Sequence, residues 1–221
     1  MSLQILHIVV FLSLALFGCE RDFPIIIGNE TEGYQIVGKL TDVLGNPVVQ
    51  VPIKMYYDFQ HVDDNLPAST DFDVTNGAQV IRVRVYDSEN RLIRTLYNGV
   101  HNVGTMRIVW NKMIAQGVFA PSGVYTVQFI IENEVRKSYP VVVNETITAV
   151  TDTSGAFEFS DKHLPVGFYP VPLYSSDNSQ YYGQFRITNV VALEFITEAT
   201  TKAVLVSLSK GTISRVNVIL E

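Results

Sequence analysis

Apolar and polar residues alternate along most of the chain. In the segment VIRVRVYD, residues 80–87, the alternation places Val83 and Val85 on one face of a strand and Arg82 and Arg84 on the other. Segments of this kind are rich in Val, Ile, Thr, Tyr and Phe, and turn signals separate them about every eight to twelve residues. The pattern predicts an all-β fold of the sandwich type.

The first strands are expected at residues 35–40 and 48–56, on either side of a turn at 44–47. Helical spacing with caps is not sustained along the chain, and only residues 189–199 fit a helix as well as a strand. Strands therefore account for nearly all of the predicted structure.

Two segments share one turn chemistry, namely TDVLGNP at residues 41–47 and TDTSGAF at 151–157. Each places an Asp before a Gly. The Asp carboxylate can accept hydrogen bonds from turn amides, and the Gly can adopt a positive φ angle. Both segments are predicted to form tight hairpins.

These two hairpins and a later L-P-x-G-x-Y segment resemble the carboxypeptidase-regulatory-like, transthyretin-type domain. Three motifs carry the resemblance in order, and the matching residues are Gly38, Asp42, Gly45, Pro47, Val51 and Ile53, then Thr151, Asp152, Gly155, Phe157 and Phe159, then Leu164, Pro165, Gly167 and Tyr169. The resemblance implies a β-sandwich of the kind that serves as a non-catalytic appendage in zinc carboxypeptidases.

A long stretch separates the first motif from the second, where that family has a short loop, and this predicts an insertion. The stretch resembles the immunoglobulin-like domain of the flagellar hook-capping protein FlgD, at Val85, Tyr86, Asp87, Arg94, Thr95, Leu96, Trp110, Pro121, Ser122, Gly123, Val124 and Tyr125. Asn90 stands where that family has a turn glycine, and asparagine tolerates the left-handed conformation. The resemblance implies that Trp110 lies in the core of an inserted sandwich.

The predicted architecture is therefore two immunoglobulin-like/transthyretin-like β-sandwiches, one inserted in the other. The expected parts are a lipoprotein signal peptide at 1–18, a tether at 19–33, the host sandwich at 34–60 and 145–221, and the inserted sandwich at 61–144. The connections are expected at residues 61–75 and 144–146, because insertions succeed at loop tips when the guest's ends lie close together. We also expect residues 51–57 and 148–159 to share one host sheet.

The start of the chain has an apolar run at residues 5–17, followed by the only cysteine, Cys19. The run has the length of a signal-peptide core and is short for a bilayer span. The residues LFGC at 16–19 resemble the lipobox of bacterial lipoproteins, which implies a lipid anchor on Cys19 and export to the periplasmic face or the cell surface. Residues 1–10 carry no Lys or Arg, so an uncleaved anchor helix and an ordinary secretory leader stay as alternatives.

The chain has 22 acidic and 16 basic residues and a formal net charge of −6, which disfavours nucleic acid as a partner. It contains no G-x-S-x-G elbow, Walker loop or H-E-x-x-H motif. None of His61, His101 and His163 begins the H-x-x-E pair of zinc carboxypeptidases. We predict a protein that is not an enzyme and that carries no cofactor.

A cluster of acidic residues is the one metal-binding candidate. Carboxylates are suitable calcium ligands, and the cluster consists of Asp58, Asp63, Asp64, Asp71 and Asp73. Their spacing matches no known loop motif, so we interpret the cluster as a solvated acidic linker and predict no metal site.

Four aromatic residues flank the polar loop SSDNSQ, and they are Tyr174, Tyr181, Tyr182 and Phe185. Exposed aromatics can stack on sugars or anchor a partner protein, but in β proteins they more often cover a sheet end.

The sequence leaves two hypotheses for the function. The first is a non-catalytic cell-envelope lipoprotein acting as a structural or protein-interaction module with an unknown envelope or surface partner. The alternative is a glycan- or peptide-binding surface module that uses this loop or an open sheet edge.

Overall fold

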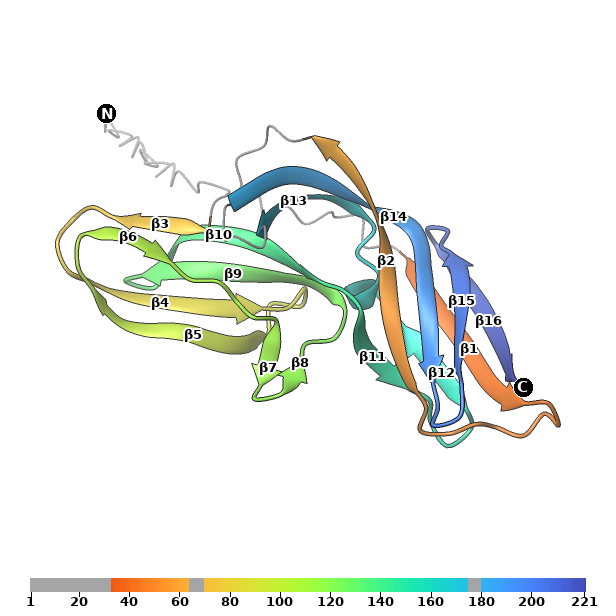
Figure 1. Ribbon diagram of the computed structural model, residues 1–221. Helices are drawn as coiled ribbons and strands as arrows, with labels where there is room; N and C mark the ends of the chain where they lie inside the picture. The colour runs from red at the N-terminus through yellow and green to blue at the C-terminus, as the bar shows by residue number, and fades with distance from the viewer. Residues whose placement is uncertain (1–32, 64–69, 175–179) are drawn as a thin grey trace, which may run out of the picture.

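The computed structural model describes residues 33–63, 70–174 and 180–221, and nearly all of its regular elements are strands (Figure 1). The all-β prediction is confirmed. Across these three ranges, no helix has the length and apolarity needed to cross a membrane.

The host sandwich is built from strands that lie before and after the insertion. They are β1 (Tyr34–Asp42), β2 (Pro52–Asp63), β11 (Thr146–Val150), β12 (Ala156–Phe159), β13 (Gly167–Tyr174), β14 (Gln180–Ile196), β15 (Thr201–Ser207) and β16 (Thr212–Leu220), with a short 3-10 helix η1 (Asp161–His163). One sheet has the order β12-β1-β16, and the other has the order β11-β2-β14-β13 with β15 also paired to β14. Their facing side chains form one hydrophobic core, which includes Ile36, Leu40, Ile53, Phe159, Leu193 and Phe195.

The long strand β14 serves two parts of the host. Its second half pairs with β15 and with the beginning of β2, over the host core. A register shift between Ile187 and Val191 follows its first half, which pairs with β13 and with the end of β2. This first half of β14 lies on the side of the inserted sandwich. Its partner β13 contacts β10 (Glu134–Val143), an edge strand of the inserted sheet (Figure 1).

The inserted sandwich has its own core. Its strands are β3 (Asp71–Val74), β4 (Gln79–Tyr86), β5 (Leu92–His101), β6 (Gly104–Arg107), β7 (Met113–Ala115), β8 (Val118–Phe119), β9 (Gly123–Ile131) and β10 (Glu134–Val143). A four-stranded sheet, β10-β9-β4-β5, packs against the β3-β6 pair, where Phe72 stacks on Phe129 at 5.0 Å. Val83, Val85 and Trp110 are buried in this core, as the sequence predicted.

The strand expected at residues 48–56 is displaced. It begins at Pro52 and runs to Asp63. Gln50 has a positive φ of 58°, which breaks the extended backbone just before β2. At the other end, β2 continues past residue 60 because β14 pairs with it there, so the expected connection at 61–75 is shorter and β3 already begins at Asp71.

The expectation that residues 148–159 share one sheet with residues 51–57 is wrong. Strand β11 does pair with β2, but β12 pairs with β1 in the opposite sheet. The tight turn after Thr151 carries the chain from one sheet to the other. The segment 189–199, which fitted either a helix or a strand, continues β14 as far as Ile196.

Three turns share one geometry, and they begin at Asp42, Asp87 and Asp152. In each turn the carboxylate accepts hydrogen bonds from the amides two and four positions later. The residue three positions after the Asp has a positive φ, and these residues are Gly45, Asn90 and Gly155. Side-chain hydrogen bonds, from Asn46 and Ser154 respectively, are the main reason that the pKa values of Asp42 and Asp152 are lowered. The turn chemistry predicted for the two host segments is therefore present, and the inserted sandwich repeats it. The prediction of a hairpin at residues 151–157 is wrong, because this turn joins β11 to β12, which belong to different sheets.

The two host turns are held together although they are distant in sequence. The Leu40 amide donates to the Gly155 carbonyl at 2.8 Å, and the buried Thr151 hydroxyl donates to the Val48 carbonyl at 3.0 Å. A Cβ atom on Gly155 would lie 2.4 Å from the Leu40 carbonyl oxygen, whereas one on Gly45 would meet nothing within 4 Å. The two glycines thus have the same backbone conformation in different surroundings.

We predict that Gly155→Ala destabilises the protein clearly more than Gly45→Ala. Both changes place a side chain at positive φ, which costs about 1–2 kcal/mol. Gly155→Ala adds a backbone clash of roughly 1–3 kcal/mol. Urea denaturation of both variants measures the difference, and equal losses would contradict the close contact between the two turns.

Candidate functional site at the junction of the two sandwiches

The segment PSGVY, residues 121–125, lies where the inserted sandwich meets the host. The Ser122 hydroxyl, 1% exposed, donates to the carbonyl of Met55 in β2 at 3.0 Å. The Ser122 amide donates to the hydroxyl of Thr148 in β11, also at 3.0 Å. A residue of the inserted sandwich is thus hydrogen-bonded to two adjacent host strands.

Apolar and close backbone contacts extend this junction. Val142 of β10 is buried in the host core, and Val124 of β9 packs against it. A Cβ atom on Gly123 would lie 3.2 Å from the carbonyl oxygen of Lys162, so η1 approaches the start of β9 closely. The side chain of Asn144, between β10 and β11, accepts a hydrogen bond from the Tyr57 amide at 2.8 Å. The two sandwiches therefore share a packed interface and are not joined by the two chain crossings alone.

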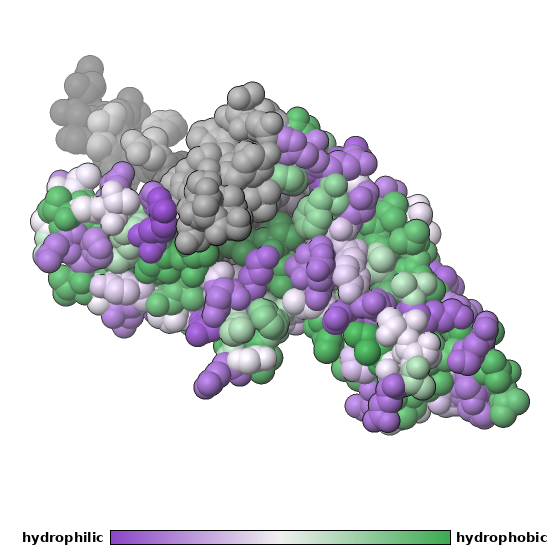
Figure 2. Space-filling model, in the orientation of Figure 1, coloured by the Kyte–Doolittle hydropathy of each residue, from purple (hydrophilic) through white to green (hydrophobic). Residues whose placement is uncertain are grey.

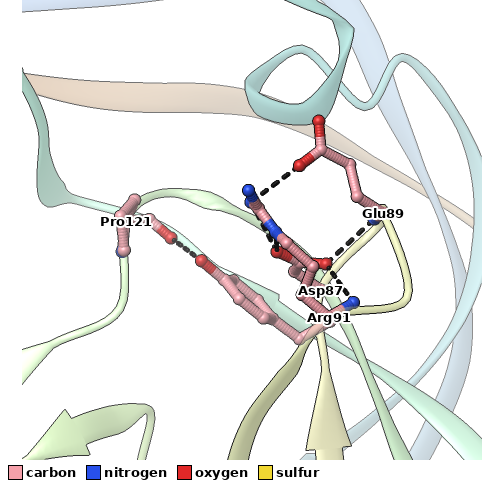
Figure 3. A network of polar contacts seen from close by, with 5 residues as sticks. Asp87, Glu89, Arg91 and Pro121 are labelled. Carbon is pink, nitrogen blue, oxygen red and sulfur yellow. Dashed lines mark hydrogen bonds and ion pairs between the residues drawn. The ribbon is translucent and has the colours of Figure 1, made fainter.

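The turn between β4 and β5 presents a charged cluster at this interface (Figure 3). The Asp87 carboxylate accepts a hydrogen bond from Arg91 Nε at 2.8 Å, and a guanidinium nitrogen of Arg91 lies 2.7 Å from both Asp87 and Glu89. The hydrogen bond to Asp87 is the main cause of the raised pKa of Arg91. Nearby, the Tyr125 hydroxyl donates to the Pro121 carbonyl at 2.9 Å, and burial raises the pKa of Tyr125 to about 12.

His163, at the end of η1, faces the same place from the host. Its backbone carbonyl accepts a hydrogen bond from the buried Tyr57 hydroxyl at 2.7 Å, and its ring packs edge-on against Phe159. The ring atom Nδ1 is buried and has no hydrogen-bond partner among the described residues. Burial first, and then the positive charge of Lys162, lower the pKa of His163 to about 4. The imidazole is therefore neutral at pH 7.

These groups line a partly open pocket of about 210 Å³ between the two sandwiches. Its lining residues are Asp87, Ser88, Arg91, Ile93, Ile114, Pro121, Val124, Tyr125, Lys162 and His163. Ile114 belongs to the β7-β8 hairpin, which protrudes from the surface (Figure 2) and exposes Val118 and Phe119. The pocket combines apolar walls with two cationic side chains, one carboxylate and one neutral imidazole.

Sequence analysis predicted a different binding surface around residues 174–185. Tyr174, Tyr181 and Tyr182 lie on β13 and β14, in the hairpin whose loop is outside the described residues, as are the contacts of these three side chains. Phe185 packs against the host core, and its ring lies 5.1 Å from that of His61 on the neighbouring strand. Cys19 also lies outside the described residues.

The acidic residues considered as calcium ligands have other partners. Asp58 accepts a hydrogen bond from Thr188, Asp73 accepts one from Thr105, and Asp71 forms an ion pair with Arg107. Asp64 and the side chain of Asp63 lie outside the described part of the chain. Within that part, no group of three or more His, Cys, Asp or Glu residues could hold a metal ion.

The comparisons with known proteins agree with the fold of the inserted sandwich. Residues 58–132 match the family model of the FlgD Ig-like domain. The matched range contains the Asp87 turn and the PSGVY segment, and it ends before β10, which completes the four-stranded sheet. No match was found among curated proteins or solved structures. An FlgD Ig-like domain indicates a structural or interaction module.

We predict that Ser122→Ala lowers the free energy of unfolding by about 1–2 kcal/mol, because it removes a buried hydrogen bond between the sandwiches. Ser88→Ala is the matched control, since Ser88 is exposed and surface changes usually stay within about 0.5 kcal/mol. Urea denaturation followed by Trp110 fluorescence measures both. Equal stability of the two variants would show that the junction hydroxyl contributes nothing.

His163 predicts a dependence of stability on pH. Its pKa is about 4 in the folded chain and rises to the ordinary 6.5 on unfolding, so the unfolded chain binds the extra proton between these values. The stability that the neutral ring contributes is complete above pH 6.5 and is lost as the pH falls towards 4. Allowing for partial exposure, we expect roughly 1–3 kcal/mol.

The measurement is urea denaturation of the wild type and of His163→Gln at several pH values between 7 and 4. The stability difference between the two proteins is expected to change in favour of the variant as the pH falls. Parallel pH profiles would contradict the low pKa of His163.

Proposed function

We propose that this protein is a non-catalytic cell-envelope lipoprotein that is anchored through Cys19 and presents its two sandwiches as one structural or protein-interaction module. The packed junction is the observation that carries the proposal. Domains of one chain move relative to each other unless their interface is large and apolar. Here Ser122, Val124 and Val142 bury the inserted sandwich against the host, which suits a module that holds a binding surface in a constant position.

The beginning of the host fits a tethered arrangement. The Gly33 carbonyl accepts a hydrogen bond from Gly211, and the Tyr34 amide donates to the Asp161 side chain in η1. The chain thus enters the host beside η1, close to the junction pocket. Gly33 lies fourteen positions after Cys19, and an extended chain of that length spans at most about 50 Å. A lipid on Cys19 would keep the junction within that distance of the membrane.

The side chains of the pocket suit binding better than catalysis. The Asp87 carboxylate already accepts hydrogen bonds from two turn amides and from Arg91, so it is poorly placed to act as a base. The hydroxyl of Tyr125 has a pKa of about 12 and donates to a carbonyl. We therefore assign the protein no enzymatic activity and no cofactor.

We further propose that the host sandwich is of the carboxypeptidase-regulatory-like type. Its two predicted turns are hydrogen-bonded to each other across the insertion, through Leu40 with Gly155 and through Thr151 with Val48. The residue Leu164 of the third motif is buried in the host core. The motif residues thus occupy positions that hold this sandwich together.

We predict that Cys19→Ser abolishes lipid attachment and releases the protein from the membrane fraction of a bacterial expression host, because the thiol is the only site for thioether formation. Ser13→Ala, in the apolar run, is the matched control, and it should change neither the lipid attachment nor the amount of protein in the membrane fraction. The measurements are incorporation of an alkyne-labelled fatty acid and the intact mass of the purified chain.

Two outcomes would contradict the lipid anchor. A wild-type chain that stays in the membrane without label, with residues 1–18 still attached, would indicate an uncleaved anchor helix. A wild-type chain that is cleaved, unlabelled and released would indicate an ordinary secretory leader. Neither outcome bears on the packed junction.

A further inference from the structure

We propose that the junction pocket binds the C-terminal residue of a partner protein, with the free carboxylate beside Lys162 and an apolar side chain against Ile93, Ile114 and Val124. The inference rests on the proposed interaction function and assigns it a site and a ligand class. In this pocket, side chains of both sandwiches contribute to a single concave surface.

The size of the pocket limits its ligand. Pockets for drug-sized molecules have volumes of about 300–1,000 Å³, whereas this one has about 210 Å³. A single large side chain fits this volume and a longer segment does not. The walls formed by Ile93, Ile114 and Val124 favour an apolar side chain, and the Tyr125 ring adds an aromatic surface.

The charges of the pocket favour an anionic group next to that side chain. Lys162 has no carboxylate within 4.0 Å of its amine among the described residues, whereas Arg91 is already paired with Asp87 and Glu89. Lys162 and Arg91 both lower the pKa of His163, and only Glu89 opposes them. Positive charge therefore outweighs negative charge among the groups that act on the pKa of the imidazole.

The imidazole also offers a hydrogen bond that the chain leaves unused. The His163 ring lines the pocket, and its Nδ1 is buried without a partner in the described residues. Because Nδ1 is closed to solvent, a ligand reaches it only when the ring turns towards the pocket. In that orientation a carboxylate accepts the hydrogen bond from Nδ1–H and pairs with Lys162 at the same time.

The last residue of a protein chain carries an apolar side chain and a free carboxylate on the same Cα atom when that residue is apolar. A neutral glycan lacks the charge. An acidic glycan and an internal Asp or Glu carry a carboxylate but lack the apolar side chain. A phosphate group lacks it too, so a phosphate would leave the walls of the pocket unfilled. Capture of a C-terminal carboxylate is a recurring mode of peptide recognition.

The test uses the protein from residue 19 onward with Cys19→Ser, labelled with ¹³C in its histidine rings. The probe is N-acetyl-phenylalanine, and its amide and N-acetyl-alanine are the matched controls. N-acetyl-phenylalanine should bind saturably in the millimolar range, as suits a ligand of one residue. It should also raise the pKa of His163 from about 4 to above 5, because a carboxylate favours the protonated ring. The amide and the alanine compound should each bind at least tenfold more weakly.

Lys162→Met should weaken the binding of N-acetyl-phenylalanine about tenfold, and Lys39→Met, on the outside of β1, should leave it unchanged. Circular dichroism shows whether each variant folds. Equal binding of the acid and the amide, or an equal loss in both lysine variants, would overturn the proposal.

Two further results would also overturn it. One is an absence of saturable binding by the acid at concentrations up to about 20 mM, far above the expected millimolar constant. The other is an equal effect of inorganic phosphate on His163, which would identify a general anion site. The lipid anchor and the packed junction are measured separately by Cys19→Ser and Ser122→Ala, so a failure here is distinguishable from a failure of the proposed function.

Discussion

The hydrogen bond from the Ser122 hydroxyl to the Met55 carbonyl is the contact on which the arrangement of this molecule depends. Ser122 directly precedes β9, an inner strand of the inserted sheet, and Met55 lies near the beginning of the host strand β2. A polar group buried at this place is stable only with a partner, so the hydrogen bond favours this relative position of the two sandwiches. Val142 in the host core and Val124 packed against it add apolar contacts between the two sandwiches.

The sequence predicted the structure well where neighbouring residues in the chain determine it. Alternation identified the inward faces of Val83 and Val85, and the order of Asp and Gly identified the host turns. It failed at residues 48–51, where the positive φ of Gln50 interrupts the extended backbone, and at β12, because the sheet to which β12 belongs depends on its pairing with the distant strand β1. The extended length of β2 likewise reflects its pairing with β14, which no local pattern contains.

The junction pocket was only partly accessible from the sequence. Tyr125 and the Asp87 turn were named as parts of a domain pattern, and their place at an interface was not apparent. His163 was considered only as a metal ligand, and no sequence pattern marked Lys162 as a binding residue. Both residues reach the pocket through the short helix η1, which follows a host motif some forty residues after the PSGVY segment. A pocket between two sandwiches has no periodicity of its own, so only the packing of both reveals it.

Insertion, in contrast to a tandem arrangement, explains why such a pocket can persist. The chain crosses between the sandwiches twice, after β2 and before β11, and the Asn144 side chain binds the Tyr57 amide at the second crossing. Two crossings restrict the rotation of one sandwich relative to the other more than a single linker does, because a rotation about one crossing would have to displace the other. Strand β14 adds a third restraint, since it extends from the host core to the side of the inserted sandwich. Residues from both sandwiches can therefore keep a constant separation, which recognition of a ligand as small as one residue requires.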